Sequence, residues 1–117
     1  MLPHTRKQQI MIIITIRMVV LPNKKRELQQ ALVGLAGAMR GEKGYVSHHI
    51  CQDIENENVI YVWETWRSRK NLDNHWRSDG FSALLGSSHL LASAIELQMH
   101  VVSHTAGLEA ARLARDE

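Results

Sequence analysis

The chain has 117 residues, of which 44% are hydrophobic and 22% charged, and its formal net charge is +2. These values lie near the average of globular proteins, so they predict one folded domain and exclude a chain that is disordered throughout. The net charge is too small to favour nucleic acid as a partner. A single cysteine, Cys51, excludes a disulfide within the chain and fits a reducing compartment, so we expect a cytoplasmic protein.

Residues 1–10 are polar and are expected to form a flexible N-terminal extension, with Met11 as an alternative biological start. Residues 10–20 are rich in isoleucine and valine, which favours a strand. Thr15 and Arg17 interrupt this run, and it is shorter than the roughly 20 residues that a membrane span needs, so we expect no membrane contact. The run hardly alternates between apolar and polar residues. Both of its faces are therefore expected to be covered, one by helices and the other by a second copy of the chain.

Residues 21–44 have the pattern of a helix, with Asn23 as the expected N-cap and with Gly41 and Gly44 at its end. Six apolar residues recur at helical spacing and predict one buried stripe: Leu28, Ala31, Leu32, Leu35, Ala36 and Met39.

Residues 45–54 and 58–67 predict two strands joined by the polar turn "ENEN", which is typical of a hairpin. Ser68 is the expected cap of a second helix, which carries Leu72, His75 and Trp76 and should break near residues 78–80 before it resumes. The sequence "GSSH" is expected to lead into a last strand that alternates clearly. The tail has helical propensity.

This βαββαβ order predicts the ferredoxin-like α+β fold, a four-stranded antiparallel sheet with both helices on one face. The other face would be bare, so a homodimer with sheet facing sheet is the simplest way to cover it. The predicted division of the chain is an N-terminal extension at 1–10, the domain at 11–104 and a helical tail at 105–117.

The third strand and second helix contain the pattern E-x-W-x-S followed by L-x-x-H-x-x-S-x-x-F, and "RGEKGY" precedes the second strand. The residues of the pattern are Glu64, Trp66, Ser68, Leu72, His75, Ser78 and Phe81. Over roughly residues 11–103 this resembles the antibiotic biosynthesis monooxygenase family of dimeric α/β barrels. The resemblance implies a homodimer with a pocket between sheet and helices. It also implies oxidation of quinols or polyketide anthrones by molecular oxygen, without metal or flavin.

Glu64 and Trp66 should share one face of their strand, with Trp63 on the other. His75 is the first candidate for the catalytic base, Glu64 for the group that orients it, and Trp66 for a pocket wall. Each of the three has a structural alternative. Trp66 would be a core ring under the second helix, and His75 and Glu64 a buried pair that joins helix to strand.

His48 and His49 are adjacent on a strand, so they should point to opposite faces and cannot grip one metal ion together. His49, which shares a face with Ser47 and Cys51, is a weaker candidate for binding substrate. Arg17 would bind an anionic substrate oxygen or pair with a carboxylate such as Glu96. No spacing of cysteines and histidines resembles a zinc site, so we expect neither a metal nor another cofactor.

The sequence therefore favours a cofactor-independent monooxygenase of a small aromatic, quinol or polyketide-like compound. The alternative is a dimeric binding or stress-response protein of the same fold, which holds a small apolar molecule without turnover. Haem-degrading monooxygenases also share this fold, but Ile16, His75 and Leu85 stand at the positions of their characteristic residues. An RNA-binding module is disfavoured because the first strand has no aromatic residue.

Overall fold

The computed structural model describes residues 11–116 and contains four strands and four helices. In chain order they are β1 (Met11–Val20), α1 (Lys25–Met39), β2 (Tyr45–Gln52), β3 (Val59–Trp66), α2 (Arg69–Trp76), α3 (Asp79–Leu91), β4 (Ala92–Val102) and α4 (Leu108–Arg115). The extension expected at residues 1–10 lies outside the described residues, and the division of the chain into three segments remains a prediction.

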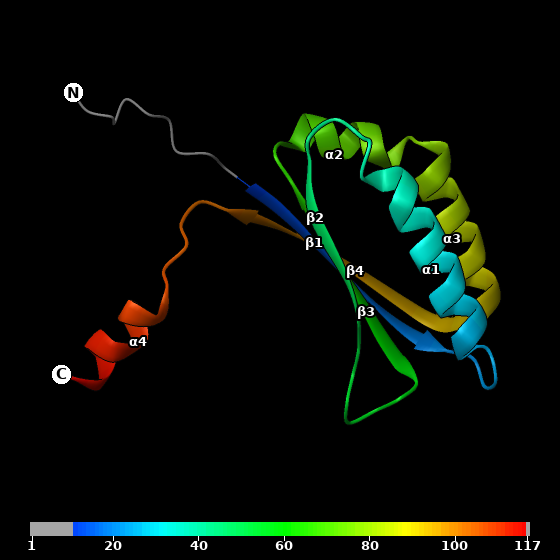
Figure 1. Ribbon diagram of the computed structural model, residues 1–117, viewed down its shortest axis with the longest axis horizontal. Helices are drawn as coiled ribbons and strands as arrows, with labels where there is room; N and C mark the ends of the chain where they lie inside the picture. The colour runs from blue at the N-terminus through cyan, green and yellow to red at the C-terminus, as the bar shows by residue number, and fades with distance from the viewer. Residues whose placement is uncertain (1–10, 117) are drawn as a thin grey trace.

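The strands form one antiparallel sheet in the order β2-β3-β1-β4. Helices α1, α2 and α3 all lie on the same face of this sheet, and its other face is left open (Figure 1). This is the ferredoxin-like α+β fold, and the predicted element order is confirmed. The fold arises because two β-α-β units share one sheet, so that both crossing segments pack on a single face.

The core lies between this sheet face and the helices. Strand β1 alternates between buried residues and half-buried ones, and the buried set faces the helices: Ile12, Ile14, Ile16, Met18 and Val20. Within one protomer the other face of β1 is therefore only partly covered. The buried stripe of α1 packs on the same core through Leu28, Leu32, Ala36 and Met39.

Two predicted boundaries are wrong. Lys24, which makes no side-chain capping hydrogen bond, occupies the N-cap position of α1 in place of Asn23, because Asn23 adopts a left-handed backbone with φ of 65° and lies in the preceding turn. The "GSSH" segment is not a linker, since α3 runs on to Leu91 and β4 follows at once. Ser88 fits inside this helix because its buried hydroxyl lies 3.8 Å from the sulfur of Met18.

The register of β4 places Leu97 and Met99 on the helix-covered face, opposite Ile16 and Ile14. These side chains are nevertheless partly exposed, as is Val101, because α3 covers only the beginning of the strand. Beyond β4 the chain leads to α4, which stands away from the body (Figure 1).

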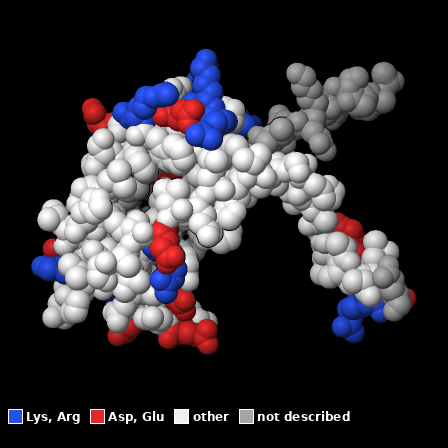
Figure 2. All heavy atoms as spheres, turned by 180° about the vertical axis from the view of Figure 1, so that it is seen from behind, with Lys and Arg blue, Asp and Glu red and all other residues white. Residues whose placement is uncertain are grey.

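Charged side chains of both signs are interleaved on the face seen in Figure 2, and no broad area of one sign is present there. None of the helices described in residues 11–116 is long and apolar enough to cross a membrane.

Candidate active site

A small cavity of about 40 Å³ lies between the helices and the covered face of the sheet. Its walls are mainly apolar, and three polar side chains, Glu42, His48 and His75, reach it. The apolar lining comes chiefly from α1 and the sheet and includes Leu32, Leu35, Ala36, Met39, Ile50 and Val62. A few polar groups that converge on an apolar hollow are the usual features of a small-molecule site.

The break between α2 and α3 positions His75. Ser68 caps α2 by accepting a hydrogen bond from the Asn71 amide at 3.1 Å, as the sequence predicted. The helix ends one residue after His75, and Ser78 then fixes the corner: its hydroxyl donates to the His75 carbonyl at 2.6 Å and accepts from the Phe81 amide at 3.2 Å. The imidazole is thus held next to a hydrogen-bonded corner between α2 and α3.

The ring of His75 is only 4% exposed and lies between two aromatic rings. It stacks on Trp66 with centroids 4.5 Å apart and an interplanar angle of 27°, and Phe81 meets it edge-on at 5.5 Å. These contacts fix the plane of the imidazole, so its two nitrogens point in defined directions.

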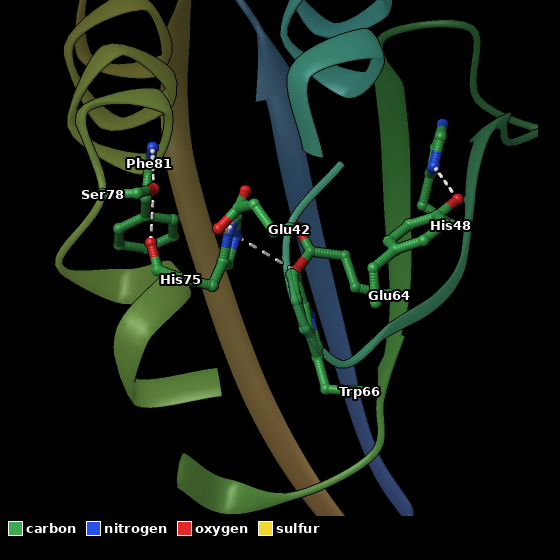
Figure 3. A network of polar contacts seen from close by, with 8 residues as sticks. Glu42, His48, Glu64, Trp66, His75, Ser78 and Phe81 are labelled. Atoms are coloured by element: carbon green, nitrogen blue, oxygen red, sulfur yellow. Dashed lines mark hydrogen bonds and ion pairs between the residues drawn. The ribbon is translucent and has the colours of Figure 1, made fainter. Parts of the chain in front are cut away.

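Glu42, in the loop between α1 and β2, holds one nitrogen of His75. Nδ1–H of the imidazole donates to the Glu42 carboxylate at 2.9 and 3.1 Å (Figure 3). A carboxylate on Nδ1 selects the tautomer in which Nε2 is free to accept a proton. Nε2 of His75 is buried and forms no hydrogen bond within residues 11–116.

Glu64 lies on the other side of the imidazole, near the C-terminal end of β3. Its Oε1 accepts a hydrogen bond from the Trp66 indole N–H at 3.0 Å and lies 3.5 Å from Nε2 of His75 (Figure 3). Burial raises the pKa of the Glu64 carboxyl, and the charge of Glu42 acts in the same direction. The Trp66 hydrogen bond and the charge of His75 oppose the rise.

The direction of this pKa shift predicts how Glu64 affects stability. Folded Glu64 keeps its proton to a higher pH than the unfolded chain, so above about pH 4.5 the folded state binds more protons. The free energy of unfolding linked to Glu64 therefore falls as the pH rises through this window, until the raised pKa is passed. Glu64→Gln has no charge to bury and keeps an oxygen for Trp66. We expect urea unfolding to show that the variant gains stability relative to the unmodified chain as the pH rises.

Glu57→Gln is the matched control, because Glu57 is exposed in the turn between β2 and β3. Its stability should follow that of the unmodified chain at every pH. A Glu64→Gln protein that instead becomes steadily less stable than the unmodified chain as the pH rises would show that the carboxylate is stabilised in its charged form.

The structure brings together three of the predicted site residues, Glu64, Trp66 and His75. It places the two weaker candidates, His49 and Arg17, on the opposite sheet face. His49 lies across from Trp63 in the register, and Trp63 is 48% exposed on that face.

Arg17 forms an ion pair of 3.4 Å with Glu96, in an open hollow of about 370 Å³ that is separate from the cavity. The sequence had offered this pairing as an alternative to substrate binding. The sheet separates Arg17 and His49 from the cavity that His75 reaches, so a role for them in binding substrate there would need a second protomer or another site.

Two polar residues of the cavity, Glu42 and His48, were missed by reasoning from the sequence. Glu42 belongs to the "RGEKGY" segment that preceded the second strand, which was the available signal. His48 lies opposite Glu64 in the register of β2 and β3, so it is on the sheet face that borders the cavity. His49, the next residue, is on the other face. Within residues 11–116 no group of three or more His, Cys, Asp or Glu side chains is placed to hold a metal ion.

A model of the family described as antibiotic biosynthesis monooxygenase matches residues 11–85 of the chain. The chain belongs to this family. The match includes Glu42, Glu64, Trp66 and His75, and the resemblance noted in the sequence is therefore confirmed.

Among curated proteins, an uncharacterised protein of Synechocystis sp. is 29% identical over 87 residues. The match covers 74% of this chain and 59% of that protein. The chain thus spans less than two thirds of its relative's length.

Several solved structures share the fold of this chain. SnoaB from Streptomyces nogalater, a cofactor-independent oxygenase, has a TM-score of 0.73 at 15% identity, over 81% of this chain and 95% of its own. A protein of Deinococcus radiodurans assigned to the same family has a TM-score of 0.77 at 16% identity, over 82% of this chain and 96% of its own. At these identities the likeness concerns the fold.

Proposed function

We propose that this protein is a cofactor-independent monooxygenase that oxidises a small aromatic, quinol or polyketide-like substrate with molecular oxygen. The observation that carries the proposal is an oriented base at an apolar cavity: Glu42 holds Nδ1 of His75, and Nε2 has no hydrogen-bond partner in the described chain. Membership of the monooxygenase family and the fold shared with SnoaB support it.

For an anthrone-like substrate, the proposed reaction begins when Nε2 of His75 removes a proton from its activated CH₂ group. The carbanion passes an electron to O₂, and the radical pair combines into a peroxide with a new C–O bond. The peroxide takes up a proton. Loss of the second C–H proton then breaks the O–O bond, forming a carbonyl group and releasing the outer oxygen as water after it is protonated. The substrate supplies all four electrons that reduce O₂, so no further reductant is needed.

Each of the named side chains has a part in this scheme. Trp66 and Phe81 fix the plane of the His75 ring and exclude water from it. Glu64, whose carboxyl pKa is raised by burial, can share a proton with Nε2 of His75 across 3.5 Å. Glu42, rather than Glu64, takes the part of the group that orients the base.

The cavity must widen before it can hold such a substrate. Its volume of about 40 Å³ holds a few water molecules, whereas ligand sites measure roughly 300–1,000 Å³. Widening would part α1 and α3 from the sheet, or release the loop that Glu42 tethers to His75. We also propose a cytoplasmic homodimer, in which a second copy covers the open sheet face with its half-exposed Trp63.

A non-catalytic binding protein is the second candidate. The contacts among Glu42, His75, Glu64 and Trp66 form a continuous seam between loop, helix and strand, which is what a purely structural network would look like. Such a protein would bind a small apolar molecule without consuming oxygen.

Oxygen uptake distinguishes the two functions. Purified protein, treated with chelator, is mixed in an oxygen electrode cell with a panel of hydroquinones, naphthoquinols and anthrones. We expect at least one compound to be consumed together with oxygen, faster than without protein. Binding of panel members, detected by calorimetry, with no oxygen uptake from any of them would support the non-catalytic function instead.

A further inference from the structure

A second histidine reaches the cavity from β2, and the oxygenation scheme above does not use it. His48 lines the cavity and lies directly opposite Glu64 in the register of β2 and β3. The Tyr45 hydroxyl lies 2.7 Å from Nδ1 of His48, and the two rings are tilted with centroids 5.8 Å apart. Within residues 11–116 this is the only side-chain hydrogen bond of His48.

The contact with Tyr45 favours one tautomer of His48. A phenol O–H is a good donor, and a bare imidazole nitrogen is a good acceptor, so a distance of 2.7 Å fits O–H···N from Tyr45 to Nδ1. The remaining ring proton of a neutral His48 is then on Nε2. That nitrogen becomes a hydrogen-bond donor on a ring that lines the cavity, in contrast to the neutral tautomer of His75 that the contact with Glu42 selects, which has no proton on Nε2.

The surroundings of His48 favour an uncharged ring. Burial lowers the pKa of His48, and the positive charges of Arg40, at the end of α1, and His49, its neighbour on β2, lower it further. Glu64 faces it from β3 and is itself a carboxyl whose pKa is raised, so it offers little negative charge to draw a proton onto the ring. A neutral imidazole N–H can stabilise a developing oxygen anion without a formal charge of its own.

We propose that Nε2–H of His48 donates a hydrogen bond to the oxygen anion of the bound substrate, with Tyr45 as the positioning residue that fixes its tautomer. This inference rests on the proposed function and divides the work at the cavity: His75 takes a proton, and His48 stabilises the resulting anion. The ligand class that fits is a phenol or enol that ionises at oxygen. The apolar wall of Leu32, Leu35 and Ile50 suits the ring of such a ligand.

Nuclear magnetic resonance of the full chain with nitrogen-labelled histidine tests the tautomer without any ligand. At neutral pH the His48 spectrum should show a protonated Nε2 and a bare Nδ1. Tyr45→Phe should convert it to a mixture of tautomers, while His89, exposed on α3, keeps its spectrum. A His48 that carries its proton on Nδ1, or that is doubly protonated at neutral pH, would overturn the inference.

The colour change of 4-nitrophenol on ionisation tests the anion contact. Bound to the unmodified chain, this probe should ionise at a lower pH than in water. His48→Phe, which keeps a ring but removes the donor, should reverse most of that shift, and the control His89→Phe should not. An equal shift in His48→Phe, or no binding of the probe to the unmodified chain, would contradict the proposal.

The two proposals fail in different ways. If His48 lowers the ionisation pH of the bound probe but no panel compound is oxidised, the hydrogen-bond role of His48 is supported and the monooxygenase proposal fails. If the His48→Phe variant consumes oxygen as fast as the unmodified chain, the monooxygenase proposal is supported and the hydrogen-bond role of His48 fails.

Discussion

Replacing His75 with alanine should slow oxygen consumption by about 10² to 10⁴-fold, the usual contribution of a positioned general base. The reason is that Nε2 of His75 is the nitrogen left free by the Glu42 contact, on a side chain that lines an apolar cavity. Glu42→Gln should retain the ring but weaken the selection of its tautomer, so its rate should fall between those of His75→Ala and the unmodified chain. Oxygen uptake at a saturating substrate concentration measures all three.

The control for this prediction is His89→Ala, because His89 is an exposed histidine on α3. Its rate should equal that of the unmodified chain. Circular dichroism and urea unfolding of each variant show whether the fold is retained. A folded His75→Ala protein with an undiminished rate would show that this histidine only joins α2 to the sheet.

Trp66→Ala should lower the free energy of unfolding by about 3–5 kcal/mol, as expected for a large ring removed from a core. Trp66 is fully buried, stacks on His75 and donates to Glu64, so its loss leaves both a cavity and a buried carboxyl without its hydrogen bond. Urea unfolding followed by circular dichroism measures the cost, with the pH held constant so that Glu64 does not change its charge.

Trp63→Ala is the matched control, since Trp63 is the tryptophan of the same strand that faces the open side and is half exposed. Its cost should be much smaller. The two variants should be compared at several protein concentrations, because a cost of Trp63→Ala that grows with concentration would report association between copies instead of packing within one protomer. Equal costs at low concentration would contradict the assignment of the two faces.

The fold could be predicted from the sequence because its signals are local. The β-branched run of β1, the stripe of α1 and the hairpin of β2 and β3 each specify an element, and their order leaves few topologies. The boundaries that failed lie where tertiary contacts decide. Ser88 and its neighbours look like a loop, but packing against Met18 keeps them helical.

The site was predictable only in part, for the same reason. A period of two places Glu64 and Trp66 on one face, and helical spacing from Leu72 predicts that His75 is buried. Glu42, however, meets His75 from a loop 33 residues earlier, which no periodicity can indicate.

The choice between His48 and His49 depends on strand register, since a shift of one residue exchanges the two faces. Here an unbroken register from the hairpin turn to Ser47 places His48 opposite Glu64, and the pairing shifts only beyond it, between Tyr45 and Ser47.

Labelled dioxygen tests the central claim, oxygenation by an oriented histidine without a cofactor, most directly. Chelator-treated protein is supplied with an anthrone-like substrate under isotopically heavy O₂, and the mass of the product is measured by mass spectrometry. We predict one heavy oxygen atom in the carbonyl product of the unmodified chain, and a greatly reduced yield from folded His75→Ala. Oxygenation by His75→Ala at the rate of the unmodified chain, or no labelled product from the unmodified chain with any panel substrate, would contradict the account.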